Sequence, residues 1–399
     1  MAVGQAVEAG TEVLLFEKMK QPGLKLGITG KGRCNITNIA EKADFIAHFG
    51  KTGKFLHQAF SHFFNIELMV FLENLGLKLV TERGGRVFPA GGKATEVRAV
   101  LLKWINKSGT IVNNFSPVDE LLMDNGQITG IVSKGRIFSA DAVIVATGGA
   151  SYPLTGSTGD GYGFAGSAGH TIIPIRPALV PLETAGNTTG RMTELNLRNI
   201  KVKMLVNGKK QQEEFGELVF TPFGLTGPVI LTLSGAAVDA GREGKKVIFS
   251  IDLKPALNEQ KLDARLRRDF AGRGKEPLSS VLRGLLPRAM VPVCLELINL
   301  SPDRPANGIT VKERRRLRIW LKDFRLEMVK PRPLKEAIIT AGGVNLREIN
   351  PRTMESKLIK GLYFAGEVLD LQADTGGYNL QAAFSTGWLA GRAATQKIN

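Results

Sequence analysis

Two short apolar segments that end in glycine turns, 141–149 and 361–370, constrain the fold of this chain most strongly. They read DAVIVATGG and GLYFAGEVLD, and strands this uniformly apolar are typical of a parallel sheet that is covered on both faces. In open α/β folds, ligands bind where such strands end. We therefore expect Thr147, Gly148 and Gly149 at a ligand crevice, and we expect the second segment to repeat the arrangement.

The first residues fit the second half of a β-α-β unit. A helix of small residues ends at Gly10, and the strand TEVLLFE follows it and ends at Glu17. In a dinucleotide-binding fold, a carboxylate at this strand end accepts hydrogen bonds from the adenosine ribose. An apolar strand that ends in Glu-Lys is also common on protein surfaces, so the strand alone leaves both interpretations open. The flanking helix and loop favour the ribose ligand.

One G-x-G-x-x-G sequence, a pattern typical of phosphate binding at a helix N-terminus, stands at 161–166. It does not follow a strand directly, and Pro174, Pro177 and Pro181 interrupt the region where the next strand should run. Glu183 lies near the expected offset for a ribose ligand. We nevertheless interpret the motif as a glycine-rich helix start.

A loop rich in hydrogen-bond donors, GLKLGITGKGRCNITN, occupies 23–38. Its glycines permit close approach of the backbone, and its side chains suit a flat, polar, anionic ligand. The candidate contacts are Lys25, Thr29, Gly30, Gly32, Arg33, Asn35 and Thr37. Cys34 stands among them, and a lone cysteine beside apolar and small residues is expected to be buried and not reactive.

The segment GGYNLQAAFSTG, 376–387, predicts a helix that begins directly after two glycines, Gly376 and Gly377. The free N–H groups and positive dipole end of such a helix would stabilise the negative charge that a reduced flavin carries near N1 and its C2 carbonyl. A glycine turn before an ordinary helix explains the pattern equally well on physical grounds.

The chain between about 180 and 333 has a different texture. Period-two segments joined by glycine and proline turns predict a small antiparallel barrel or sheet over 180–256, and a basic helical stretch follows over 257–333. The formal net charge is +16, and residues 261–335 hold 19 Lys plus Arg against 8 Asp plus Glu. The helix TVKERRRLRIWLKDFRLEM, with a capping box at Thr310 and Glu313, favours a solvated basic face over a polyanion-binding surface.

Other function classes find little support. No apolar run is long enough for a membrane span, and Glu8 and Glu12 stand where a signal peptide would be apolar, so we expect a cytoplasmic protein. The two cysteines form no redox pair, and the four histidines show no metal-ligand spacing. A G-x-S-x-G motif is absent, which argues against a serine hydrolase.

Together the motifs resemble those of bacterial flavoproteins, the NAD(P)/FAD-dependent oxidoreductases of the BaiN/YhiN, aminoacetone-oxidase-like family. The resemblance covers essentially all 399 residues, through VLLFEK, TGKGRCNITN, GRVFPAGGKA, DAVIVATGG, TGDGYGFAGSAGH, FTPFGLTGPVILTLS, GLYFAGEVLD and GGYNLQAAFSTGWLAG. It implies an α/β chain with a glutathione-reductase-like, Rossmann-like FAD-binding domain formed by 1–179 and 334–399. The β-barrel of 180–256 and the helical module of 257–333 would be inserted into it.

The resemblance also implies a cofactor and the residues that hold it. FAD would be the cofactor, NAD(P)H a candidate reductant, and a small organic molecule the substrate, while nucleic acid is not an expected partner. Glu17 and Lys18 would meet the adenosine end, and Arg33 and Asn35 the ribityl-flavin end. The other side of the flavin would be lined by Gly366, Glu367, Asp370, Asn379, Leu380 and Gln381.

Members of this family begin with a strand and a glycine triplet, so about 15 to 20 residues are expected to be missing from the amino end of this copy. The pyrophosphate would then lose charge-assisted hydrogen bonds worth about 1.5 to 3 kcal/mol each. An inactive scaffold, or one that binds RNA through the basic module, is the alternative function. Lys25, Tyr152 and Asp374 all stay open as acid or base.

Overall fold

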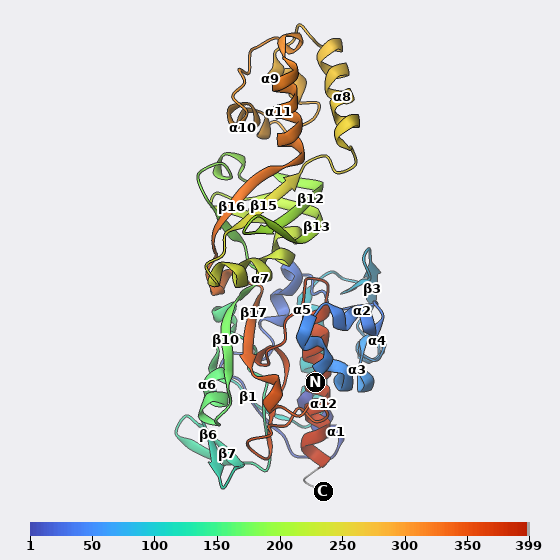
Figure 1. The fold of residues 1–399 in the computed structure, drawn as a ribbon. Coiled ribbons are helices and arrows are strands. Elements are labelled where there is room, and N and C mark those ends of the chain that lie inside the picture. The colour runs from blue at the N-terminus through green and yellow to red at the C-terminus, as the bar shows by residue number, and fades with distance from the viewer. Residues whose placement is uncertain (397–399) are drawn as a thin grey trace. The chain divides into compact units, whose positions relative to one another are not determined.

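The computed structural model describes residues 1–396, which form two compact units (Figure 1). Unit 1 consists of Met1–Ala178 and the chain from Leu334 onward, and unit 2 consists of Leu179–Pro333. Every strand ladder in the described chain joins strands of the same unit. Unit 2 is therefore a separate body inserted into the sequence of unit 1.

Two parallel strand pairs lie in unit 1. β9 (Val143–Val145) pairs with β18 (Leu362–Phe364), and β1 (Leu14–Phe16) pairs with β5 (Ile111–Asn113). The first pair joins the two apolar segments noted in the sequence, and all three residues of β18 are buried. Because parallel strands end at the same edge of a sheet, the glycine turns after β9 and β18 lie next to each other. The predicted Rossmann-like α/β fold is confirmed.

The closing helix α12 (Tyr378–Gln396) lies in the core of unit 1 and packs against α1 (Ala2–Glu8) (Figure 1). The two backbones come very close, because a Cβ at Gly391 would lie only 2.3 Å from the carbonyl oxygen of Ala2. A small residue is needed there for the helices to touch.

The segment LKLVTERGGRVFP, with Gly84 and Gly85 at its middle, predicts a hairpin, and this hairpin forms between β3 (Leu79–Glu82) and β4 (Arg86–Pro89). The stretch FLHQAFSHFFNIELMVFLENLG predicts one helix but forms two. The chain is extended at Phe63, and the carboxylate of Glu67 accepts a hydrogen bond from the Phe64 N–H and starts a new helix. The other elements between β1 and β9 are β2 (Thr37–Asn38), α2 (Lys42–Ala47), α3 (His57–His62), α4 (Asn65–Asn74), α5 (Ala94–Lys107), β6 (Val118–Asp124), β7 (Gln127–Ser133) and β8 (Arg136–Ser139).

The region after β9 corrects one expectation. The G-x-G-x-x-G sequence begins a helix, α6 (Asp160–Ser167), as predicted. The prolines that follow do not prevent a strand, because β10 (Ile172–Ala178) contains Pro174 and Pro177 and pairs with β17 (Ile339–Val344). A bulge in β10 accommodates Pro174, and the pairing is antiparallel. β10 is therefore not the second strand of a dinucleotide-binding unit.

Unit 2 begins with a closed barrel of strand order β11-β14-β13-β12-β15-β16, which confirms the predicted barrel. Its longest hairpin is β12 (Asn196–Val206) with β13 (Lys209–Phe220), and from Ile200 onward every second side chain of β12 is buried. The other barrel strands are β11 (Leu182–Thr184), β14 (Gly224–Thr226), β15 (Val247–Asp252) and β16 (Phe324–Pro331).

Two segments of unit 2 adopt a different structure from the predicted one. The segment ELVFTPFGLTGPVILTLS predicts strands, but its last part, VILTLS, belongs to α7 (Pro228–Arg242). Gly227 and a proline at the first helical position set up a helix start there. The basic amphipathic helix was expected to include Phe324 and Met328. Instead α11 (Val311–Lys322) ends before them, and both lie in β16, because strand pairing, of Phe324 with β15 and of Met328 with β11, outweighs the helical periodicity.

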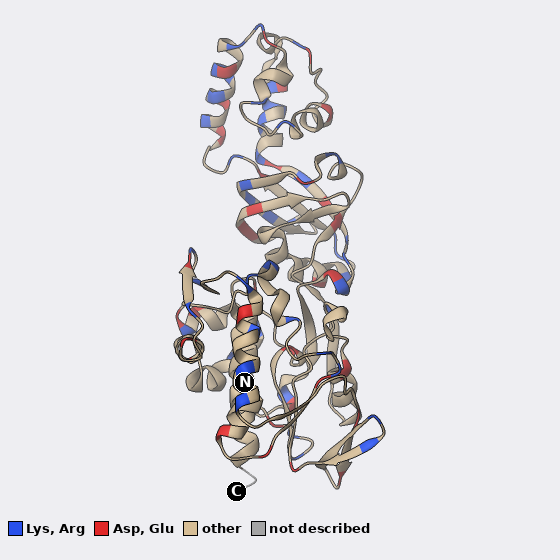
Figure 2. Cartoon of the chain, turned by 180° about the vertical axis from the view of Figure 1, so that it is seen from behind, with Lys and Arg blue, Asp and Glu red and all other residues tan. Residues whose placement is uncertain are grey.

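Two of the helices between β15 and β16, α8 (Glu259–Gly272) and α11, carry many basic side chains (Figure 2). Lysines and arginines alternate with acidic residues along α8, and Arg314 and Arg318 of α11 reach Asp263 of α8 at 2.9 and 3.5 Å. These ion pairs join α8 to α11. The helices that precede α11 are α8 (Glu259–Gly272), α9 (Leu278–Leu282) and α10 (Met290–Leu297).

The predicted capping box of α11 is present, and it makes the stability of unit 2 depend on pH. Glu313 accepts a hydrogen bond from the Thr310 N–H at 2.8 Å, and this bond, with further bonds from Thr310 and Arg304, lowers the pKa of Glu313 from 4.5 to about 2. Because the folded pKa is depressed, the stabilisation is present above about pH 4.5 and is lost as the pH falls toward 2. We expect Glu313→Gln to lower the stability of unit 2 at pH 7 by about 1 kcal/mol.

Thermal unfolding followed by circular dichroism at pH 7 and at pH 3 tests this prediction. The difference between the variant and the unaltered protein should shrink at pH 3, where the Glu313 carboxylate begins to protonate. Glu296→Gln is the matched control, because Glu296 is 64% exposed and its ion pair with Arg191 lies at the surface. An effect of Glu313→Gln that is equal at both pH values would contradict the prediction.

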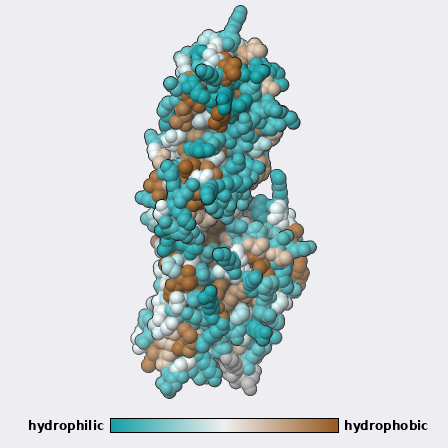
Figure 3. Space-filling model, viewed as in Figure 1, coloured by the Kyte–Doolittle hydropathy of each residue, from teal (hydrophilic) through white to brown (hydrophobic). Residues whose placement is uncertain are grey.

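The exposed surface is mostly hydrophilic, with apolar residues in small separate groups on the face that Figure 3 shows. Among the described residues, no helix combines the length and the apolar character that crossing a membrane requires.

Candidate functional site

The loop after β1 and the glycines before α12 lie directly against each other. Gly377 has a φ of +98°, and a Cβ there would lie 2.4 Å from the carbonyl oxygen of Thr37. Asn38 Nδ2 donates to the Gly376 carbonyl at 3.2 Å, and Thr37 Oγ1 donates to Gln381 Oε1 at 2.6 Å. Stretches 338 residues apart in sequence thus lie side by side. A flavin that is bound by both stretches requires this arrangement.

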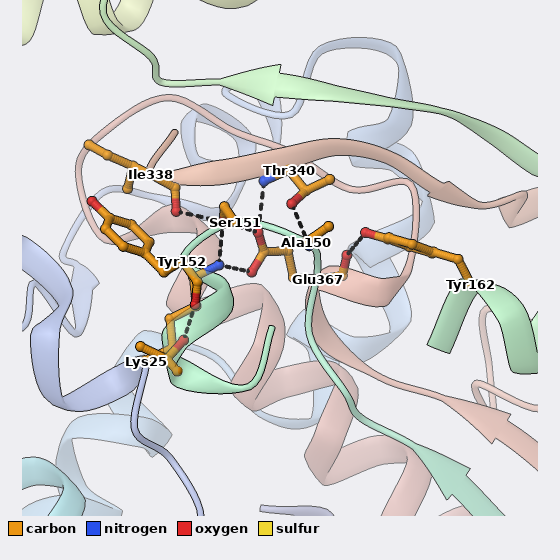
Figure 4. A network of polar contacts seen from close by, with 9 residues as sticks. Lys25, Ala150, Ser151, Tyr152, Tyr162, Ile338, Thr340 and Glu367 are labelled. Atoms are coloured by element: carbon orange, nitrogen blue, oxygen red, sulfur yellow. Dashed lines mark hydrogen bonds and ion pairs between the residues drawn. The ribbon is translucent and has the colours of Figure 1, made fainter. Parts of the chain in front are cut away.

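A buried polar network joins the same loop to the turns after β9 and β18 (Figure 4). Lys25 Nζ lies 2.6 Å from Glu367 Oε2 and donates to Ser151 Oγ at 2.7 Å. The other carboxylate oxygen of Glu367 accepts from the Thr340 N–H at 2.8 Å. The side chains of Lys25 and Glu367 are 19% and 20% exposed, so their attraction acts largely out of water.

Glycines at the two strand ends let this network close. A Cβ at Gly149 would lie 2.5 Å from Thr340 Oγ1 and 2.8 Å from Glu367 Oε1. Gly148 and Gly366 have φ values of +75° and +77°, a region that favours glycine. The predicted crevice residues therefore have a packing reason to be glycine, whatever ligand they meet.

The neighbouring Thr147 has a structural contact. A Cβ at Gly161, the first glycine of the G-x-G-x-x-G sequence, would lie 2.2 Å from Thr147 Oγ1, whereas one at Gly163 or Gly166 would have open space. The motif therefore packs the start of α6 against the end of β9. This agrees with its interpretation as a helix start.

The end of β1 faces the turn before α6. Glu17 Oε1 accepts from the Met19 N–H at 2.7 Å, and partial burial raises the pKa of Glu17. Lys18 Nζ lies 2.6 Å from Asp160 Oδ2 and also contacts Thr158 Oγ1. Lys18 is thus brought together with Asp160, which sequence reasoning missed because the contact spans 142 residues.

The loop itself is tightly turned. Gly30, Lys31 and Gly32 all have positive φ, and Thr29 Oγ1 donates to the Leu26 carbonyl at 2.8 Å. The adjoining Cys34 is buried as expected, and desolvation raises the pKa of its thiol to about 11. A thiol with this pKa is largely protonated at neutral pH and is a poor nucleophile.

Two residues of this loop that were predicted to contact the flavin, Arg33 and Asn35, differ in their surroundings. Arg33 pairs with Glu82 at 2.5 Å and lies over the ring of Phe88 at 4.3 Å, so its guanidinium is already engaged by the β3–β4 hairpin. Asn35 Oδ1 is buried and has no hydrogen-bond partner in the part of the chain that the structure describes. An orphaned buried acceptor of this kind is rare and points to a missing donor.

The remaining predicted residues surround the start of α12. The Asp370 N–H donates to the Val344 carbonyl at 3.1 Å, and the Asn379 side chain bonds both the N–H and the carbonyl of Ala373 at 2.9 Å. Leu380 packs against an apolar cluster of unit 1. These contacts order the loop ahead of the helix.

Ser151 and Thr340 join Asp160 as site residues that sequence reasoning missed. Ser151 stands two positions after Gly149. The rule that ligands bind where parallel strands end could therefore have identified it. Thr340 lies inside a buried strand, and no sequence pattern marks its contact with Glu367.

The residues present fit a flavin. An isoalloxazine ring offers both N–H donors and carbonyl acceptors. The unpartnered Asn35 Oδ1 can take a donor, and the first N–H groups of α12, which have no partner within the helix, can serve an acceptor.

Comparison with known proteins supports this reading. The model of the HI0933-like protein Rossmann domain family matches residues 1–393. The 3-dehydro-bile acid delta(4,6)-reductase of Clostridium scindens is 30% identical over 390 residues, which are 98% of this chain and 94% of the relative. The ribosomal RNA dihydrouridine synthase of Escherichia coli is 28% identical over 384 residues, or 96% of this chain and 92% of the relative.

Among solved structures, the 3-ketosteroid delta1-dehydrogenase of Sterolibacterium denitrificans aligns with 99% of this chain and 97% of its own, at 13% identity and a TM-score of 0.52. This likeness concerns the fold alone. The family match covers nearly the whole chain and confirms the predicted FAD-dependent oxidoreductase with FAD as its cofactor. The chain belongs to the HI0933-like family of Rossmann-domain proteins.

Proposed function

We propose that this protein reduces a carbon–carbon double bond that is conjugated to a carbonyl group, with FAD as the hydride carrier. The observation that carries the proposal is that the two relatives compared above, from Clostridium scindens and Escherichia coli, are named for such reductions. A delta(4,6)-reductase of 3-dehydro-bile acids acts on double bonds that are conjugated with a 3-oxo group. A dihydrouridine synthase saturates the C5–C6 bond of uracil, which is conjugated to the C4 carbonyl.

The site residues have distinct parts in this proposal. Bound FAD supplies the hydride. The N-terminus of α12 stabilises negative charge at the pyrimidine side of the ring, and Asn35 holds a ring donor. Lys25 and Glu367 fix the loop and both strand ends relative to one another, and Glu17 with Lys18 accommodates the adenosine end.

The electron donor and the compartment are part of the same proposal. Cys34 and Cys294 are both free and buried, so they cannot relay electrons to the flavin as a dithiol. A diffusible donor such as NAD(P)H fits this better, and the cytoplasm is where it is abundant.

The substrate has two candidate sources, a small enone or a uracil within RNA. The RNA candidate is favoured by the exposed Lys312, Arg315 and Arg316 of α11, of which only Arg316 comes near an acidic side chain, Glu313 at 4.0 Å, in the described chain. The small-molecule candidate is favoured by the extensive pairing of the other basic side chains in unit 2.

One experiment separates these candidates. The FAD-loaded protein, reduced with NADPH or dithionite, is offered cyclohex-2-enone in one arm and an unmodified ribosomal RNA transcript in the other. Flavin reoxidation without oxygen reports reduction, and mass spectrometry detects cyclohexanone or dihydrouridine. We expect a product in one arm. If RNA is the substrate, neutralising Lys312, Arg315 and Arg316 should weaken binding and flatten its salt dependence. No product in either arm would contradict the proposal.

A further inference from the structure

A half-exposed polar pair lies beside the start of α12. His48, which follows α2, places Nδ1 3.0 Å from Asp374 Oδ2, and the two side chains are 35% and 38% exposed. The His48 ring also stacks on Tyr378, with centroids 3.8 Å apart and planes 20° from parallel. Tyr378 is the first residue of α12, so the pair lies at the helix end that meets the loop around Thr37.

The surroundings hold this pair in one arrangement. Asn379 fixes the backbone of Ala373 immediately before Asp374, and Asn38 holds the Gly376 carbonyl after it. Tyr378 can fold back toward this loop only because position 376 is glycine, since a Cβ there would lie 2.4 Å from the tyrosine ring. With Nδ1 engaged by Asp374, the free nitrogen of His48 is Nε2, which has no hydrogen-bond partner in the described chain.

We propose that His48 is the proton donor of the reduction, oriented by Asp374; this inference rests on the proposed function. Hydride addition to the β-carbon of a conjugated C=C moves the π electrons toward the carbonyl and leaves an enolate. The imidazolium gives its Nε2 proton to the α-carbon, becomes neutral, and regains a proton from solvent. The substrate thus gains one hydride and one proton, which is the two-electron reduction of the double bond.

The other acid candidates are less available. Lys25 is engaged by both Glu367 and Ser151 and is mostly buried. Burial, with Glu367 and Asp370, raises the pKa of Tyr162 far above its ordinary value. His170 has a fully buried side chain that bonds Glu348 and Ser356 through its two nitrogens. His48 combines an oriented ring, a free nitrogen and partial exposure.

The test uses His48→Gln and Asp374→Asn in the FAD-loaded full chain, with His62→Gln as the matched control. His62 is exposed and also stacks on an aromatic side chain, Trp388, but it has no carboxylate partner in the described chain. With reduced enzyme and cyclohex-2-enone, we expect His48→Gln to slow flavin reoxidation by about 100-fold or more. Asp374→Asn should cause a smaller decrease, and His62→Gln no change.

A second readout is independent of turnover. The chain has four histidines, so NMR of ring-labelled protein can follow each one, and the signal missing from His48→Gln identifies His48. We expect 4-nitrophenol, whose phenolate resembles an enolate, to shift that signal and leave the His62 and His170 signals in place. If the unaltered protein reduces cyclohexenone while His48→Gln is equally fast and the signal does not move, this inference is overturned. If the unaltered protein reduces neither an enone nor RNA, the proposed function itself fails.

Discussion

Gly377→Ala is expected to destabilise unit 1 by about 3 to 5 kcal/mol and to abolish FAD retention. The φ of +98° is costly for any residue with a Cβ, and the added methyl group would lie 2.4 Å from the Thr37 carbonyl oxygen. That oxygen belongs to the backbone, so it cannot rotate away. Relief requires the loop to separate from α12, which opens the wall between them.

Urea unfolding followed by tryptophan fluorescence measures the stability, and the visible absorbance of the purified protein measures bound flavin. Gly163→Ala is the matched control, because this helical position in α6 has open space around it and a Cβ there meets nothing within 4 Å. The control should be neutral or more stable by about 0.5 to 1 kcal/mol. A Gly377→Ala protein that unfolds like the unaltered chain and stays yellow would show that the loop and α12 do not touch as described.

Lys25→Met is expected to lower the stability of unit 1 by about 1 to 3 kcal/mol and to reduce its FAD content. The substitution keeps the length of the side chain and removes its charge. Glu367 would remain mostly buried with its ion-pair partner gone, and the loop would lose its tie to both strand ends. Lys20→Met, an exposed lysine on the same segment, should change stability by less than about 0.5 kcal/mol.

A double-mutant cycle isolates the interaction. If the pair is the cause, Lys25→Met combined with Glu367→Gln should cost less than the sum of the single changes, because the neutral amide no longer needs a cation. Strictly additive effects in urea unfolding would mean that Lys25 and Glu367 act separately.

The parts of the fold that were predictable are those with a local cause. The apolar strands at 143–145 and 362–364, the turn at Gly84 and Gly85, and the capping box of Thr310 with Glu313 all depend on neighbours within a few residues. The errors have a common origin as well. VILTLS shows the periodicity of a strand, but the glycine-proline pair before it starts a helix. The run after Lys322 shows the periodicity of a helix, but strand partners hold it in the barrel.

The candidate site divides in the same way. Glu17, Lys25, Gly149 and Gly377 could be singled out because strand ends, donor-rich loops and helix starts are recognisable in sequence. Their partners Asp160, Ser151 and Thr340 could not be, because each contact depends on which strand ends meet in space. His48 illustrates the same limit: its sequence context, beside an apolar helix, favours packing, and only the approach of Asp374 from the far end of the chain gives it a chemical role.

The sequence by itself determined that a Rossmann-like α/β unit is interrupted by a barrel and a basic helical module, since hydrophobic period and turn residues are local properties. The tertiary structure alone decided how Lys25, Thr37 and His48 come to face residues 367–378. Those pairings depend on strand order and helix packing. Bringing distant segments together costs conformational entropy, which burial of apolar surface across the whole unit offsets. No single stretch of residues therefore predicts them.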